Sequence, residues 1–298
     1  MANPLDSSHS HLPVPPPPTE MTPDMLLDRY AQGERDFRSV QIVGGNLAEL
    51  DLSGANFRQA VLRGCNFSQA KLIGVNFREA KLADTNFYQA NLTLSNFIGA
   101  DLTEASLVEA NLSEAGMRSV NLIRTNLSRA ILREANLNEA TFDHAVLPHA
   151  NLTEASLSRA KMLGVAMPHA ILDHANLTSA LMNGIGLEEA TLVEALLSGA
   201  TLEGANLQGA DLSRAKMTGS HLVNVNLSRA NLRGTNLSWS TLRGANLRGA
   251  TLYRTKLCWT NLSGADLTDA VMINAKLDYA NLRHTDVQGT VLPDGFTR

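Results

Sequence analysis

A large apolar side chain recurs at every fifth position of this 298-residue chain, from Phe37 to Leu292, without an insertion or a deletion. These positions are filled only by Leu, Phe, Met, Ile and Val. A small residue, usually Ala, stands two positions before each large one, and Asn or Asp often lies between them, as in Ala-Asn-Leu-Gln-Gly at residues 205–209. A period of five fits neither an α-helix, with its 3.6 residues per turn, nor a β-strand, whose side chains alternate.

The period favours a solenoid in which each pentapeptide forms one short side and then turns. The large residue and the small one before it would point inward, and the other three positions outward. Spacings of twenty residues support a coil of twenty residues, because Pro148-His149 recurs as Pro168-His169 and Trp239 recurs as Trp259. Residues 37–292 would then form about 13 coils and a rod about 62 Å long at the usual strand spacing.

The unit resembles the A(D/N)LXX pattern of the pentapeptide repeat family throughout residues 37–292. The resemblance implies an all-β solenoid, namely a right-handed quadrilateral β-helix. Residues 27–37 are also similar to the segment that precedes the repeats in cyanobacterial members. Quinolone-resistance members of the family act as mimics of duplex DNA that bind type II topoisomerases. Some relatives join end to end through their C-termini.

The N-terminal part of the chain differs from the repeats. Residues 1–20 carry six of the ten prolines among Ser, His and Thr, which predicts a disordered tail with a polyproline II stretch. Thr22 followed by Pro23 is typical of a helix start. We therefore expect residues 21–36 to hold a short helix, over about residues 23–32, that caps the open edge of the first coil.

The C-terminal end has no comparable segment. The β-helix is expected over residues 37–292, and residues 293–298 form a short C-terminal tail. Either Phe296 folds over the last coil, or two rods meet there and make a homodimer.

Composition and motifs argue against several classes of protein. No run of eighteen apolar residues predicts a membrane span, and no secretion signal is evident, so we expect a cytoplasmic protein. Cys65, facing inward, and Cys258, facing outward, lie too far apart to form a disulfide. The chain has no catalytic, phosphate-binding or dinucleotide motif, and a packed solenoid has no substrate pocket. We expect no enzyme, no catalytic residue and no cofactor.

Outward aromatic residues are rare, and three of them, Trp239, Trp259 and Tyr279, share one column at intervals of twenty. Stacked rings on an exposed edge form an apolar strip of the kind that anchors a protein partner. Arg254 and Lys256 lie in the same stretch and could add cation–π contacts. The alternative is that the rings stack only on one another and protect the edge of the rod.

Four histidines lie on two adjacent coils: His144, His149, His169 and His174. His149 and His169 should stack about 5 Å apart. Imidazoles bind zinc and copper, but His144 and His174 would lie on neighbouring corners, too far away to complete a tetrahedral site. The pattern favours a weakly pH-responsive surface patch over a metal site.

Charge is divided along the chain, whose net charge of −4 argues against a nucleic acid as the partner. Residues 101–210 hold 13 Asp and Glu against 6 Lys and Arg, whereas residues 211–298 hold 6 against 11. A DNA mimic needs a long negative surface, but the acidic column at Glu114, Glu134 and Glu154 covers only a few coils. We therefore predict a non-enzymatic protein–protein interaction or scaffold module that acts through an outer face of the rod, formed by the aromatic column and the basic C-terminal coils, with an unknown protein partner. A DNA-mimic modulator of a type II topoisomerase is the alternative.

Overall fold

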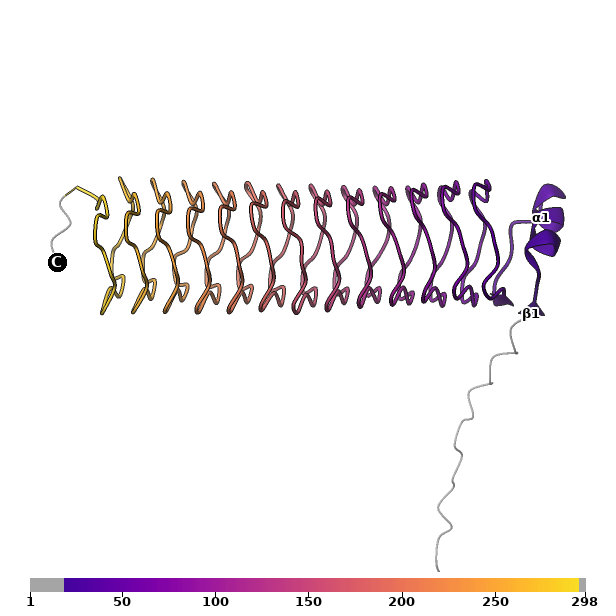
Figure 1. Ribbon diagram of the computed structural model, residues 1–298, viewed down its shortest axis with the longest axis horizontal. Coiled ribbons are helices and arrows are strands. Elements are labelled where there is room, and N and C mark those ends of the chain that lie inside the picture. Colours follow the sequence, from indigo (N-terminus) through magenta and orange to yellow (C-terminus); the bar gives the residue numbers. More distant parts are fainter. Residues whose placement is uncertain (1–18, 295–298) are drawn as a thin grey trace, which may run out of the picture.

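The computed structural model describes residues 19–294, and these form one long rod with α1 at one end (Figure 1). Parallel bridges join residues that are twenty apart in the chain, from Asp36 with Asn56 to Val271 with Val291. A turn follows every fifth residue, so each coil has four sides. The β-helix solenoid with four pentapeptides per coil, predicted from the sequence, is confirmed.

Backbone hydrogen bonds join each coil to the next. The N–H of Leu52 donates to the carbonyl of Lys71 over 2.9 Å, and the N–H of Asn76 donates to the carbonyl of Ala55 over 3.0 Å. The same pattern repeats along the rod with a shift of five residues. Because the chain turns after every fifth residue, each side pairs through a single bridge rather than through a long strand.

The corners are β-turns whose third residue has a left-handed backbone. In one of them the N–H of Ala60 donates to the carbonyl of Phe57 over 3.0 Å, and Gln59 between them has φ of 60°. Gly54 fills the equivalent position in the preceding turn, with φ of 71°. A left-handed backbone costs a non-glycine residue about 1–2 kcal/mol. The bonds to the neighbouring coils hold it in place, so many corners carry Glu, Gln, Arg or His.

The core is a column of large and small side chains inside the coils. Leu52 and Ala55 are both fully buried, and the same alternation continues along the repeats, which confirms the predicted inward pair. Where Thr replaces the small Ala, its hydroxyl finds a backbone acceptor, as Thr85 Oγ1 does on the carbonyl of Leu62 at 3.1 Å. The phenylalanines stack on two sides of the coil, with Phe67 and Phe87 centroids 5.2 Å apart.

The first described residues pack on the first coil. The strand β1 (Thr19–Glu20) pairs in parallel with β2 (Val40–Gln41), and α1 (Pro23–Ala31) lies between them in the chain. The helix predicted over about residues 23–32 is thus confirmed, and Thr22 Oγ1 accepts a hydrogen bond from the N–H of Met25 at 3.2 Å. Residues 19 and 20, which composition assigns to the tail, form a strand instead. Residues 1–18 lie outside the described part of the chain.

The helix α1 is held by apolar contact and one hydrogen bond. Leu26 is fully buried in the core cluster, and the Tyr30 hydroxyl donates to the carbonyl of Ser53 over 2.9 Å. Gly45 takes the position that Ala usually fills, because a Cβ there would lie 2.6 Å from Cγ2 of Ile42 and 3.0 Å from Cγ of Pro23. The missing methyl group gives α1 room to approach the coil.

The opposite end of the rod is more open. Leu277, Leu282, Val287 and Leu292 hold the inward position of the repeat, but they are only partly buried. Phe296, expected either to cover this end or to leave it for a second rod, lies outside the described residues.

Candidate partner-binding site

Trp239, Trp259 and Tyr279 form a stack of three rings along one corner of the rod, which we call the aromatic ladder. The ring centroids of Trp239 and Trp259 are 5.0 Å apart with an angle of 4° between the planes, and those of Trp259 and Tyr279 are 4.3 Å apart with an angle of 17°. The three residues are 63%, 49% and 75% exposed. The predicted column is therefore present, and it is open to solvent along its length.

The repeat geometry explains why the rings are parallel. All three residues occupy the left-handed turn position, with φ of 65°, 60° and 59°, on consecutive coils related by twenty residues. Identical backbone conformations one strand spacing apart place the rings face to face. Gly219 fills the same position one coil earlier, and no heavy atom lies within 4 Å of the place where its Cβ would be. The ladder therefore ends beside an open space.

The cation–π contacts in this region involve Tyr253 and not the rings of the aromatic ladder. The guanidinium carbon of Arg254 lies 5.1 Å from the ring centroid of Tyr253, and that of Arg233 lies 5.1 Å from the same ring. Arg254 stands at the corner before the ladder, so its own neighbour Tyr253 is the ring within reach. Arg254 thus makes a cation–π contact, as predicted, but with Tyr253 and not with a ring of the aromatic ladder.

Lys256 lies on the side of the rod between the corner of Arg254 and the aromatic ladder. It is exposed, and its backbone bridges to Asn236 on one coil and to Lys276 on the next. Lys256 therefore extends a positive strip toward the rings.

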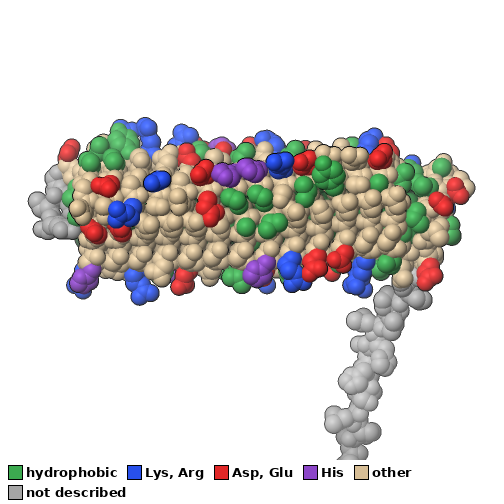
Figure 2. Space-filling view, viewed as in Figure 1, with side chains coloured by type: hydrophobic (Ala, Val, Ile, Leu, Met, Phe, Trp, Pro, Cys, Tyr) green, Lys and Arg blue, Asp and Glu red, His purple; other side chains and the backbone are tan. Residues whose placement is uncertain are grey.

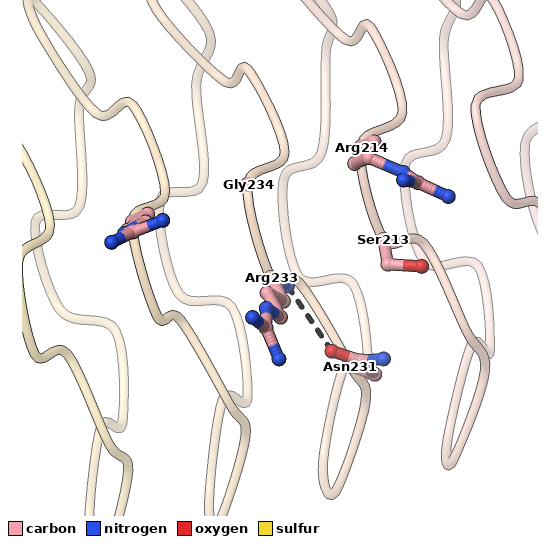
Figure 3. A pocket seen from close by; sticks show the side chains of 6 residues that line it. Ser213, Arg214, Asn231, Arg233 and Gly234 are labelled. Atoms are coloured by element: carbon pink, nitrogen blue, oxygen red, sulfur yellow. Dashed lines mark hydrogen bonds between the residues drawn. The ribbon is translucent and has the colours of Figure 1, made fainter.

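A groove that sequence reasoning did not identify adjoins this strip. It has a volume of about 540 Å³, and three arginines are among the residues that line it (Figure 3). The full lining is Ser213, Arg214, Asn231, Arg233, Gly234 and Arg254. Arg214 and Arg254 are forty residues apart, which in a twenty-residue coil is the same corner two coils apart. This periodicity is the signal that could have found them.

The histidine patch has the predicted geometry at its centre. The rings of His149 and His169 stack with centroids 4.9 Å apart and 5° between the planes. Two of the four histidines also face carboxylates: Nδ1 of His169 lies 3.5 Å from Glu189, and Nδ1 of His174 lies 3.5 Å from Glu194. Within residues 19–294, no three side chains of His, Cys, Asp or Glu converge as metal ligands would.

The acidic stretch of residues 101–210, which we call the acidic belt, is partly neutralised by arginines on neighbouring coils. Glu139 lies 3.3 Å from Arg118 and 2.7 Å from Arg159, and these arginines lower the pKa of its carboxyl. Arg129 lies 3.4 Å from Glu109. Charged side chains gather mostly along the edges of the rod, and the flank between them is largely uncharged (Figure 2). The belt is therefore a mixed surface rather than a continuous negative one.

The two cysteines are free thiols, one buried and one partly exposed. The Sγ of Cys65 lies 3.2 Å from the carbonyl of Ile42, and burial raises the pKa of its thiol. The Sγ of Cys258 lies 3.4 Å from Asp278, and its pKa is also raised, first by burial and then by that carboxylate. Neither thiol is thus activated as a nucleophile.

The bridges between coils and the turn after every fifth residue define a β-helix solenoid built from pentapeptides, with the aromatic ladder exposed along one corner. Comparison with known families gives the same class. The family described as pentapeptide repeats (8 copies) matches in overlapping segments that together span residues 135–289. The related pentapeptide repeat region matches residues 40–117 and 70–147. The chain belongs to the pentapeptide repeat family.

Solved structures of several repeat proteins match this chain, whereas no curated protein does. HetL, a pentapeptide repeat protein involved in the regulation of heterocyst differentiation in the cyanobacterium Nostoc sp. strain PCC 7120, is 29% identical. The match covers 93% of this chain and 100% of HetL, with a TM-score of 0.26. QnrB1, a plasmid-mediated fluoroquinolone resistance protein, is 18% identical over 65% of this chain and 89% of its own, with a TM-score of 0.37. Rfr23 from the cyanobacterium Cyanothece 51142 is 26% identical over 39% of this chain and 66% of its own, with a TM-score of 0.30.

The family match and the parallel bridges between residues twenty apart establish the fold of this chain. Among the residues that the structure describes, no helix has both the length and the apolar character needed to cross a membrane.

Proposed function

We propose that this protein is a non-enzymatic interaction or scaffold module that binds a protein partner through one outer face of the rod. The observation that carries the proposal is the aromatic ladder, whose Trp239 and Tyr279 are 63% and 75% exposed. Contact with water along three aromatic rings is unfavourable, and a partner that covers them removes apolar area from solvent. Trp and Tyr are also the residues that most often dominate binding energy at protein interfaces.

The rigid backbone beneath the ladder supports this proposal. The corners of Trp239 and Trp259 are bonded to the coils on both sides, as Trp259 is through its N–H to the carbonyl of Asp278 at 2.9 Å. The rings are further held by stacking on one another. A partner therefore meets a preformed surface and has little conformational entropy to remove.

The test is capture of partners by the wild-type chain and by the double variant Trp239→Ala/Trp259→Ala. Alanine keeps the Cβ, so the turn conformation is under the same constraint. Tyr88→Ala is the matched control, because Tyr88 is an exposed aromatic residue outside the ladder. We expect the double variant to lose at least one partner that the wild type and the control retain. Unchanged capture by the double variant would remove the ladder from consideration.

A second candidate function is that of a DNA mimic that modulates a type II topoisomerase. The column of Glu114, Glu134 and Glu154 on consecutive coils favours it, since like charges at one strand spacing are kept despite their repulsion. The arginines paired with Glu109 and Glu139 weigh against it. A supercoiling assay with added protein separates the two functions. No effect at micromolar protein would exclude the mimic.

The finer features of the rod belong to the same proposal. We infer a right-handed β-helix of about 13 coils, with α1 acting as the cap of the first coil.

The partly buried Leu277, Leu282 and Val287 at the other end support a homodimer through the C-terminal end. Sedimentation of the full chain tests the dimer, because a monomer at every concentration would contradict it. The free thiols support the cytoplasm as its compartment, where thiols stay reduced.

A further inference from the structure

The groove of three arginines lies at the corner next to the aromatic ladder. Arg214 and Arg254 occupy the same turn position two coils apart, and Arg233 precedes Gly234 on the coil between them (Figure 3). Because coils are spaced by about 4.8 Å, the two outer arginines are anchored about 10 Å apart. A ligand group a few ångströms wide fits between them.

Gly234 creates the opening between the outer arginines. It sits in the left-handed turn position, with φ of 70°, where most corners of this rod carry a side chain. A Cβ at Gly234 would lie 3.6 Å from Cγ of Arg214. With only hydrogen there, Gly234 itself lines the groove through its backbone.

The positive charge in this groove is incompletely balanced. Nε of Arg214 lies 3.0 Å from Glu194, which neutralises one of the three arginines. Arg233 and Arg254 instead share the ring of Tyr253, at 5.1 Å each. Within residues 19–294, neither of them is within ion-pair distance of a carboxylate, in contrast to Arg248, which lies 3.1 Å from Asp266. Two exposed guanidinium groups without a paired carboxylate are favourable partners for an anion.

The side of the rod between the groove and the ladder continues this charge. Lys256 and Lys276 are joined by a parallel bridge, which places two like charges directly opposite each other on neighbouring coils. Such a pair destabilises a sheet. Asp278 is the nearby acid, and it contacts the Sγ of Cys258. A positive strip thus leads from the arginines across one side of the rod, about 10 Å wide, to the aromatic rings.

We infer that this groove binds an oxyanion, a carboxylate or a phosphate, on an acidic segment of the protein partner. Arg233 and Arg254 hold the oxyanion through paired N–H donors, the geometry in which guanidinium groups bind carboxylate and phosphate most strongly. The segment then crosses the side of Lys256 and places an apolar side chain against the aromatic ladder. The inference rests on the proposed function, which supplies the protein partner. It adds that the segment of this partner bound in the groove is acidic.

The experiment measures binding of short fluorescein-labelled peptides to the full chain by fluorescence polarisation at physiological salt. One peptide contains Glu and Leu, the second carries phosphoserine in place of one Glu, and the third carries Gln in place of every Glu. We expect the Gln peptide to bind about tenfold or more weakly than the acidic ones. A tighter phosphoserine peptide assigns the site to phosphate, and equal affinity assigns it to carboxylates.

Two double variants locate the binding. Arg233→Gln/Arg254→Gln should weaken the acidic peptides about tenfold or more. Arg229→Gln/Arg248→Gln removes the same charge from the same stretch of coils, at the corner diagonally across from the ladder, and should change the affinity less than about twofold. Because neither Arg233 nor Arg254 pairs with a carboxylate in the described part of the chain, their variant should unfold at no lower denaturant concentration than the control.

Equal weakening by both double variants, or equal binding of the Gln and Glu peptides, would overturn the inference. The outcome is separable from that of the proposed function. Suppose that Arg233→Gln/Arg254→Gln retains every captured partner while Trp239→Ala/Trp259→Ala loses one. The partner then binds the aromatic ladder and does not bind the groove.

Discussion

The phenylalanine stack offers a quantitative test of how this solenoid is stabilised. Phe77 is fully buried, stacks on Phe57 and Phe97 with centroids 5.6 Å and 5.0 Å away, and meets Phe67 and Phe87 edge to face at 6.1 Å and 6.0 Å. The perturbation is Phe77→Leu, which installs the commonest residue of this position in the chain. Leucine fits the coil, so the variant removes ring contacts more than it removes packing.

Phe142→Leu is the matched control. Phe142 is fully buried at an inward position, and none of the ring pairs found within residues 19–294 includes it. Replacing a buried side chain by one of similar volume costs less than about 1.5 kcal/mol. Each aromatic pair adds about 0.5–1.5 kcal/mol beyond area burial. Phe77 has four ring neighbours, and the contributions of such pairs are not fully additive. We therefore expect Phe77→Leu to lower the free energy of unfolding by about 2–4 kcal/mol more than Phe142→Leu does.

The assay is guanidinium unfolding followed by circular dichroism, with hydrogen exchange to locate the loss. Coils contact only their neighbours, so destabilisation by Phe77→Leu should concentrate in the coils around it. Hydrogen exchange there should accelerate, while amides near Phe142 keep their protection. Equal destabilisation by the two variants would refute the reasoning, because it would mean that ring stacking adds nothing to burial.

Other positions give further expectations. Gly45→Ala should loosen α1 and speed its hydrogen exchange, because the new methyl group has no room, whereas Gly116→Ala, with its nearest contacts at 3.9 Å, should leave α1 unchanged. Hydrogen bonds from Ser53, together with the hydrogen bond and positive charge of Lys71 on the next coil, lower the pKa of Asp51 to about 2. The stability that this carboxylate adds is present above about pH 4 and is lost as the pH falls toward 2, so Asp51→Asn should show a smaller loss in acid unfolding. A thiol reagent should label one cysteine of the folded chain, Cys258, and mass spectrometry of its peptides checks this; labelling of both would contradict the burial.

Much of the fold could be predicted from the sequence because the period is unbroken. Once residue 37 faces inward, every fifth residue must do so, and a coil of twenty places Trp239 above Trp259 and His149 above His169. Each coil meets only the next one, so local spacing determines these contacts. The start of α1 was also predictable, since Thr22 and Pro23 act through the backbone beside them.

The remaining features depend on which side chains meet across coils. Residues 19 and 20 join β2 because α1 returns the chain to the first coil, which composition does not show. Arg254 contacts Tyr253 rather than the aromatic ladder, because one side of the rod separates its corner from those rings. The arginine groove likewise depends on Gly234 and on the pairing of Glu194 with Arg214 rather than with the other two arginines of the groove.

Periodicity in the chain thus determined which residues lie inside and which lie above one another, because a coil of constant length transmits one register along the whole rod. The tertiary structure alone decided which exposed charges are paired and where a groove opens. The reason is that long side chains choose among neighbours on several coils, and a single missing side chain, as at Gly234, changes that choice.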